Sequence, residues 1–254
     1  MSLVKSSYEF FLFYNKIVIR EGVLGLVWAV LVPIIIFISL NINWFDHKQT
    51  ITEALPFLCA FWAYITVNTF LFGVAFRIII FRENGFLRCF TYIGGSKAPI
   101  ILGLLFLQIV HGLINIAFFT SVVSSVFGYP LFLLVEIATV TFLVVSIPLI
   151  GLMLSLTTLS LQTSTLYSIA NMFMLPAMFI ALYRGTISNG FLEFIFRLTP
   201  VEFVYNTALN ISDIMLVQSN GYTLFGLLSV SLIYLICGIF SWKRIKLISV
   251  TTRT

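Results

Sequence analysis

Charged residues are scarce in this chain. Only 9% of its 254 residues are Asp, Glu, Lys or Arg, whereas 60% are hydrophobic. A typical soluble domain carries about 25% charged residues, and one of this length could not bury so much apolar surface. A bilayer core takes about 20 apolar residues per helix, so the length suits about six spans with short connections. The composition therefore predicts one membrane domain over residues 1–254.

The chemical motifs of enzymes are also absent. The sequence has no Gly-Lys dipeptide, so it has no phosphate-binding loop of the ATPase type. His47 and His111 are its two histidines, and Cys59, Cys89 and Cys237 are too dispersed for a zinc site or a disulfide framework. We expect no catalytic residue, metal or cofactor in this chain. We also expect no nucleic-acid partner, because the basic residues stand at the ends of apolar runs, where membrane topology explains them.

Six apolar runs are long enough to span a bilayer, and none carries Lys or Arg in its middle. If the N-terminus is cytoplasmic, only three of the 14 basic residues fall in segments on the outer side of the membrane, namely Lys48, Arg184 and Arg197. This positive-inside bias predicts an all-α protein of the cell membrane, with six transmembrane helices and both ends in the cytoplasm. The predicted spans are 23–42, 54–76, 99–121, 131–155, 164–183 and 222–242.

Residues 1–22 have the pattern of a helix that lies on the membrane surface. At about 100° per residue, Lys5, Glu9, Lys16 and Arg20 fall within an arc of roughly 60°, and the Phe residues lie elsewhere on the wheel. A basic face opposite an aromatic face suits an interfacial helix on the anionic cytoplasmic leaflet. An unstructured tail with chance periodicity is the alternative.

Residues 77–98 connect the second and third spans and are too polar to cross a membrane. This segment is predicted to project into the cytoplasm, with a short helix from Glu83 to Tyr92. Gly94 and Gly95 are suited to end that helix, and Pro99 is suited to open the next span. The segment is therefore a candidate docking element.

Residues 184–221 are semi-apolar and, in the predicted topology, lie on the outer side of the membrane. Pro200 is expected to break this stretch into two short helices, with Glu202 among its scattered charges. The pattern suits a re-entrant helical hairpin that dips into the outer leaflet. Irregular backbone at that depth requires a covering surface or a pathway.

Several polar residues lie inside the predicted spans. Gln108, His111 and Asn115 share one face of the third span, at spacings of three and four. They could line a pathway together with Asn68 and Asn171, or bond across to those residues. They could equally act as packing contacts, since hydrogen bonds between membrane helices average about 0.6 kcal/mol.

Two segments in this topology resemble the permeases of ABC-2 type transporters, the transmembrane subunits of ABC exporters. They are RENGFLRCFTYIGGSKAPIILG at 82–103, which contains Arg-Glu-x-Gly, and the Pro-centred FRLTPVEFVYNTAL at 196–209. The resemblance implies a second permease copy or a homologue, and two cytoplasmic ATPase subunits that bind ATP and Mg. It also implies that the predicted short helix is a coupling helix seated in an ATPase groove, with contact residues Arg82, Glu83, Asn84, Gly85, Phe86, Leu87 and Arg88.

The expected function is transport without catalysis in this chain. No charge lies at depth to stabilise a strongly charged solute, so an apolar or amphipathic cargo is expected. Amphipathic peptides of the antimicrobial or toxin-like kind are the leading hypothesis, and lipids or lipophilic drugs are the next. A non-ABC transporter or channel, and an immunity-like membrane protein that only binds a partner, are the alternatives from other classes.

Overall fold

The computed structural model describes residues 3–46, 49–159, 163–183, 195–216 and 224–245. Every regular element within these ranges is helical, as predicted. The α-helices are α1 (Leu3–Leu40), α2 (Ile51–Phe70), α3 (Arg77–Glu83), α4 (Phe86–Gly94), α5 (Ala98–Phe127), α6 (Leu131–Leu156), α7 (Thr163–Tyr183), α9 (Pro200–Met215) and α10 (Leu224–Arg244). A 3₁₀ turn, η1 (Ile42–Phe45), follows α1, and a π-helical turn, η2 (Leu71–Phe76), joins α2 to α3.

Five helices are long and apolar enough to cross a membrane, which indicates a multi-helix membrane protein. They match the last five predicted spans and are Ile51–Glu83, Ala98–Phe127, Leu131–Leu156, Thr165–Tyr183 and Phe225–Arg244. In the first predicted span, 23–42, the described apolar stretch is the shorter Ala29–Leu40. The structure therefore supports five candidate spans and leaves the sixth as a prediction.

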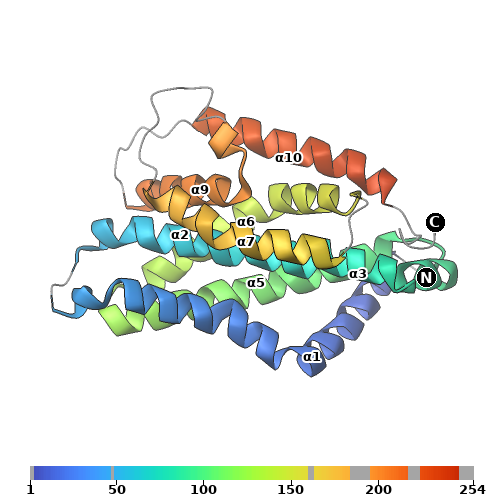
Figure 1. Cartoon of the computed structure of the whole chain (residues 1–254), viewed down its shortest axis with the longest axis horizontal. Coiled ribbons are helices and arrows are strands. Elements are labelled where there is room, and N and C mark those ends of the chain that lie inside the picture. Colours follow the sequence, from blue (N-terminus) through green and yellow to red (C-terminus); the bar gives the residue numbers. More distant parts are fainter. Residues whose placement is uncertain (1–2, 47–48, 160–162, 184–194, 217–223, 246–254) are drawn as a thin grey trace.

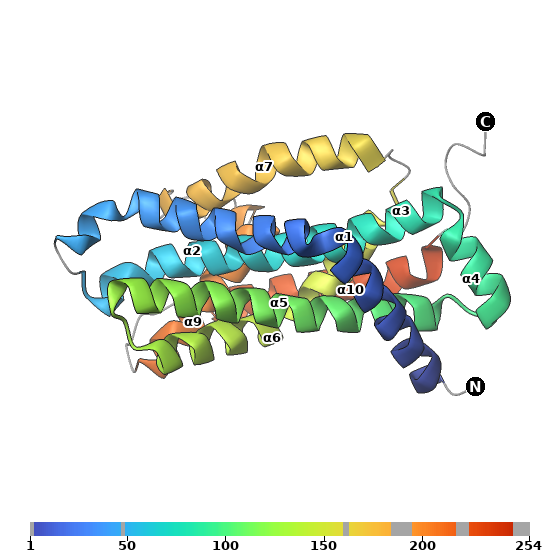
Figure 2. The same ribbon diagram turned by 90° about the horizontal axis from the view of Figure 1, so that it is seen from below.

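The predicted surface helix and first span form one continuous helix of 38 residues, α1. Figures 1 and 2 show that α1 is bent, so that its N-terminal arm leaves the direction of the rest of the helix. This arm crosses α5 closely, because a Cβ atom on Gly103 would lie 2.7 Å from the Cβ of Phe10. Lys5, Glu9 and Lys16 are exposed, as their common face on the helical wheel predicts.

The core forms around α2, which packs against α1, α5, α6, α7 and α9. Its Trp62 is buried, and the indole Nε1 donates a hydrogen bond of 2.9 Å to Thr120 Oγ1 in α5. On the other side of the bundle α6 meets α10, where a Cβ on Gly238 would lie 2.5 Å from the Cα of Gly151. Small residues let these two backbones approach, as is common between membrane helices.

Different helices lie at the two ends of the bundle. Figure 2 shows α3, α4, the start of α1 and the end of α10 gathered at one end, which we call the α4 end. The C-terminal end of α1 lies at the opposite end, and Figure 1 places α9 there as well. The helix from Ile51 to Glu83 runs between the two ends.

Candidate functional site

The short helix α4 forms between two glycines in the left-handed conformation. Gly85 has φ +74° and Gly95 has φ +72°, values that glycine adopts without steric cost. The predicted short helix is thus confirmed. It begins at Phe86 instead of Glu83, since Glu83 belongs to α3. Pro99 lies in the first turn of α5, as expected.

One face of α4 is anchored and the other is open. The side chain of Leu87 is buried, and that of Tyr92 is 79% exposed. The guanidinium carbon of Arg88 lies 6.0 Å from the centre of the Tyr92 ring, a cation–π arrangement on the open face. The exposed residues around this face are Asn84, Gly85, Phe86, Arg88, Cys89 and Tyr92.

Aromatic side chains tie α3 and α4 to the N-terminal arm of α1. The ring of Phe90 meets those of Phe10 and Phe13 edge-on, at centroid distances of 5.6 and 5.8 Å. Tyr14 stacks on Phe81 at 5.3 Å. Such pairs contribute about 0.5–1.5 kcal/mol each beyond the area that they bury, so the arm and α4 are expected to move together.

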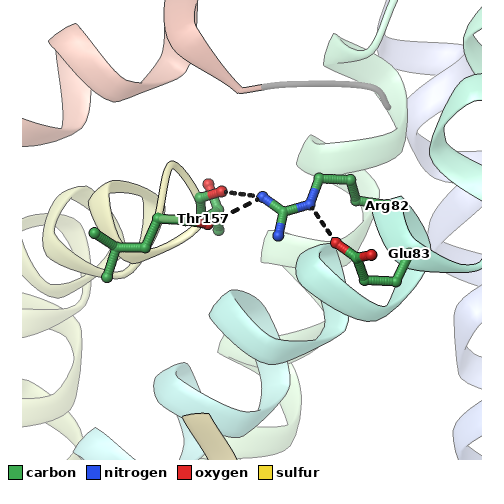
Figure 3. A network of polar contacts seen from close by, with 4 residues as sticks. Arg82, Glu83 and Thr157 are labelled. Carbon is green, nitrogen blue, oxygen red and sulfur yellow. Dashed lines mark hydrogen bonds and ion pairs between the residues drawn. The ribbon is translucent and has the colours of Figure 1, made fainter. Parts of the chain in front are cut away.

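Arg82 lies inside the protein, where only 2% of its surface is exposed. Its Nη1 donates hydrogen bonds to the carbonyl oxygens of Thr157 at 2.8 Å and Leu159 at 3.3 Å (Figure 3). Its Nε makes an ion pair of 3.0 Å with Glu83 Oε1. The resemblance to ABC-2 permeases implied that Arg82 is a polar contact with an ATPase. In the structure Arg82 instead fastens the end of α3 to the turn after α6, where terminal carbonyls lack helical partners.

Lys97, just before α5, makes a similar contact with the end of α10. Its Nζ donates to the carbonyl oxygens of Ile245 at 3.2 Å and Lys243 at 3.5 Å. A cation is favourable at the C-terminal end of a helix, where the carbonyl groups carry partial negative charge. Partial burial lowers the pKa of Lys97 below its usual value. Sequence reasoning missed this contact, because its acceptors are main-chain atoms.

The polar residues of α5 meet different partners along the helix. Gln108 is buried, and its amide packs directly on Gly73 of η2. His111 Nε2 lies 3.3 Å from Asn15 Oδ1, so this histidine is linked to the N-terminal arm of α1. Asn115 is buried as well. Gln108 and His111 thus make contacts inside the protein, which is one of the two roles predicted for this group.

The other two asparagines predicted with this group lie on α2 and α7. Asn68 is partly buried in α2. The backbone of Asn171 belongs to α7, and its side chain is outside the described part of the structure. The contact of His111 with Asn15 was not predicted, because the expected partners were Asn68 and Asn171.

The region predicted as a hairpin is described only in part, because 184–194 and 217–221 lie outside the described residues. Pro200 stands in the first turn of α9, where its missing N–H costs little. Most of α9 is buried, including Glu202, whose Oε1 accepts a hydrogen bond of 3.1 Å from Asn206 Nδ2. Farther along, Ser212 Oγ lies 3.8 Å from Cys59 Sγ in α2.

An apolar cavity of about 510 Å³ lies between α2, α6, α7 and the start of α9. It borders η2, and π-helical turns inside α-helices are frequent at functional sites. Its size is in the range of pockets that hold small ligands, about 300–1,000 Å³. The lining residues are Val67, Leu71, Phe76, Leu152, Met153, Leu156, Leu166, Ile169, Ala170, Phe173, Met174, Pro176, Ala177, Ile180, Leu198, Thr199, Pro200 and Val201.

Within the described ranges, no group of three or more His, Cys, Asp or Glu side chains could hold a metal ion. Cys59, Cys89 and Cys237 are free thiols. The chain thus offers two candidate functional features, the open face of α4 and the apolar cavity. No protein-family model, curated protein or solved structure matches the chain.

Proposed function

We propose that the chain is the transmembrane subunit of an ATP-driven exporter of the ABC-2 type, with its ATPase on a separate polypeptide. In this proposal α1 provides a sixth span, both ends lie in the cytoplasm, and the α4 end of the bundle faces the cytoplasm. The functional unit holds two copies of the permease, or one copy and a homologue, with two ATPase subunits that bind ATP and Mg. The region around α9 forms a re-entrant hairpin on the outer side.

The observation that carries this proposal is the construction of α4. The helix has an open face with Arg88 and Tyr92, and its other face is fixed by Leu87 and by ring contacts with α1. It follows directly on a helix of 33 residues that reaches the far end of the bundle. A push on the open face is therefore passed to membrane-spanning elements rather than absorbed by a loop, which is what coupling to an ATPase requires.

The proposed cargo is apolar or amphipathic, with amphipathic peptides as the first class to test. The lack of charged residues in the middle of the predicted spans supports this choice. Uptake of a fluorescent amphipathic peptide into inside-out vesicles tests it. Peptide uptake that requires ATP is expected, whereas uptake of only a lipophilic dye or a labelled lipid would favour the alternative cargo.

Association with an ATPase is tested by affinity purification of the tagged chain followed by an assay of ATP hydrolysis. We expect an ATPase to co-purify with the unaltered chain. The double variant Arg88→Glu, Tyr92→Ala is expected to lower the co-purified ATP hydrolysis at least about tenfold, because a loss of about 1.4 kcal/mol of contact energy weakens binding tenfold. The control is Lys5→Glu, an equally exposed charge reversal at the start of α1. Failure to recover any ATPase, or ATP hydrolysis by the chain alone, would reject the proposal.

A further inference from the structure

The apolar cavity has the proportions of a slot. Its lining along α7 runs from Leu166 to Ile180, a rise of about 21 Å at 1.5 Å per residue. A volume of about 510 Å³ spread along this length of α7 suits a long, thin apolar ligand better than a compact one.

The slot exists because of two small residues on α7. Ala170 and Ala177 are seven positions apart and both line it, so they lie on the same face of the helix. The facing wall includes Leu71 and Phe76, at the two ends of η2. Methyl side chains at 170 and 177 leave room beside these larger residues. A larger side chain at either position would occupy the space where a ligand lies.

The slot opens sideways along α7. Among its lining residues, Phe173 is 60% exposed, and Ile169 and Ile180 are also exposed, whereas Ala170 is buried in the floor. The helix α7 is long and apolar enough to cross a bilayer, and in that position the exposed rim would face acyl chains. An apolar cavity does not hold water well and readily accepts an apolar ligand.

We propose that this slot binds one acyl chain of a bilayer phospholipid, which enters laterally past the exposed residues of α7. The inference goes beyond the proposed transport function, because it needs only that α7 lies in a membrane. The bound chain also contacts Leu156, the residue before Thr157, whose carbonyl accepts a hydrogen bond from Arg82. A lipid in the slot therefore packs against the same turn that holds the end of α3.

The test uses the full chain in nanodiscs that contain phosphatidylcholine with a diazirine at the end of one acyl chain. After irradiation, mass spectrometry locates the cross-links. We expect them to concentrate on the lining between Leu166 and Ile180 and on η2. Ala177→Phe fills the slot and is expected to lower this labelling about tenfold. The matched control is Leu175→Phe, which adds a ring to an exposed position of α7 outside the lining and should leave labelling unchanged.

Each variant is first checked by size-exclusion chromatography, and Ala170→Leu serves as a second slot-filling variant if Ala177→Phe does not fold. Cross-links spread as densely over the exposed face of α10 as over the slot would overturn the proposal. So would labelling that both slot-filling variants leave intact. A second arm uses a free fatty acid with the same diazirine, and labelling by the free acid alone would show that the phospholipid is the wrong source of the chain.

Discussion

Replacement of Arg82 by alanine tests whether this side chain holds the α4 end together. The guanidinium donates two hydrogen bonds to carbonyl groups and pairs with Glu83, and it is 2% exposed. Alanine removes all three contacts and leaves the carbonyls of Thr157 and Leu159 without their donor. We therefore expect a loss of stability and a looser turn at Thr157 and Leu159, after α6.

The size of the loss follows from the burial of Arg82. Hydrogen bonds to charged groups contribute about 1.5–3 kcal/mol, and removal of one partner of a buried ion pair costs about 3–5 kcal/mol. Glu83 keeps some solvent contact, with 18% of its side chain exposed, so the lower end of that range applies. A loss of about 3 kcal/mol corresponds to a Tm lower by about 6–12 °C in a chain of this size.

The assay is thermal unfolding in a mild detergent, followed by fluorescence-detected size exclusion, together with hydrogen exchange of the amides around Thr157. Arg88→Ala is the matched control, because Arg88 is an exposed arginine six residues away with a cation–π contact worth about 0.5–1 kcal/mol. Arg82→Lys, which keeps the charge and loses the forked donors, should fall between the two. If Arg82→Ala and Arg88→Ala had the same Tm and the same exchange rates, the role given to Arg82 would be wrong.

Three further substitutions test other contacts. Gly238→Leu should lower the Tm by separating α6 from α10, because a Cβ at this position would lie 2.5 Å from the Cα of Gly151. Overpacking of this kind costs about 1–3 kcal/mol, and an unchanged Tm would contradict the close approach of the two helices. Gly85→Ala should cost about 1 kcal/mol in chemical unfolding, since φ is +74° there, and a neutral result would mean that the turn can relax. In a double-mutant cycle, Asn15→Ala and His111→Ala should couple by about 0.6 kcal/mol, and additive effects would show that their contact of 3.3 Å contributes nothing.

Much of the fold could be predicted because the residues of a segment themselves determine whether it can span a membrane. A span needs only a run of apolar residues of sufficient length, so five of the predicted runs overlap apolar helices, with ends that differ by at most seven residues. The C-terminal end of the short helix α4 was predictable for a similar reason, because Gly95 ends it with left-handed backbone. Its start was predicted at Glu83, which instead belongs to α3, and Gly85 separates the two helices.

The role of Arg82 could not be predicted in this way. Its acceptors are main-chain carbonyls, one of them 75 residues along the chain, and every residue has a carbonyl group. No residue type in the sequence therefore indicates which carbonyl groups Arg82 contacts. An arginine at the end of an apolar run also has a sufficient explanation in membrane topology, which hides any further role.

The cavity was equally hidden, because it depends on how α7 packs against α2. Ala170 and Ala177 are ordinary residues of a membrane helix until large residues of η2 are placed opposite them. The continuity of α1 was missed for another reason. Its polar N-terminal pattern differs from the apolar stretch that follows, and this change of composition predicted two elements where the backbone forms one.

The contacts around α4 restrict how this end of the bundle can move. Phe90 joins α4 to the arm of α1, Arg82 joins α3 to the turn after α6, and Lys97 joins the start of α5 to the end of α10. A displacement of α4 must therefore carry these elements with it or break buried contacts of about 1 kcal/mol or more each. Since Leu156 lines the apolar slot next to Thr157, a movement passed through Arg82 is expected to change the slot at Leu156. By linkage, a chain bound against Leu156 is expected to favour one arrangement of the Arg82 contacts.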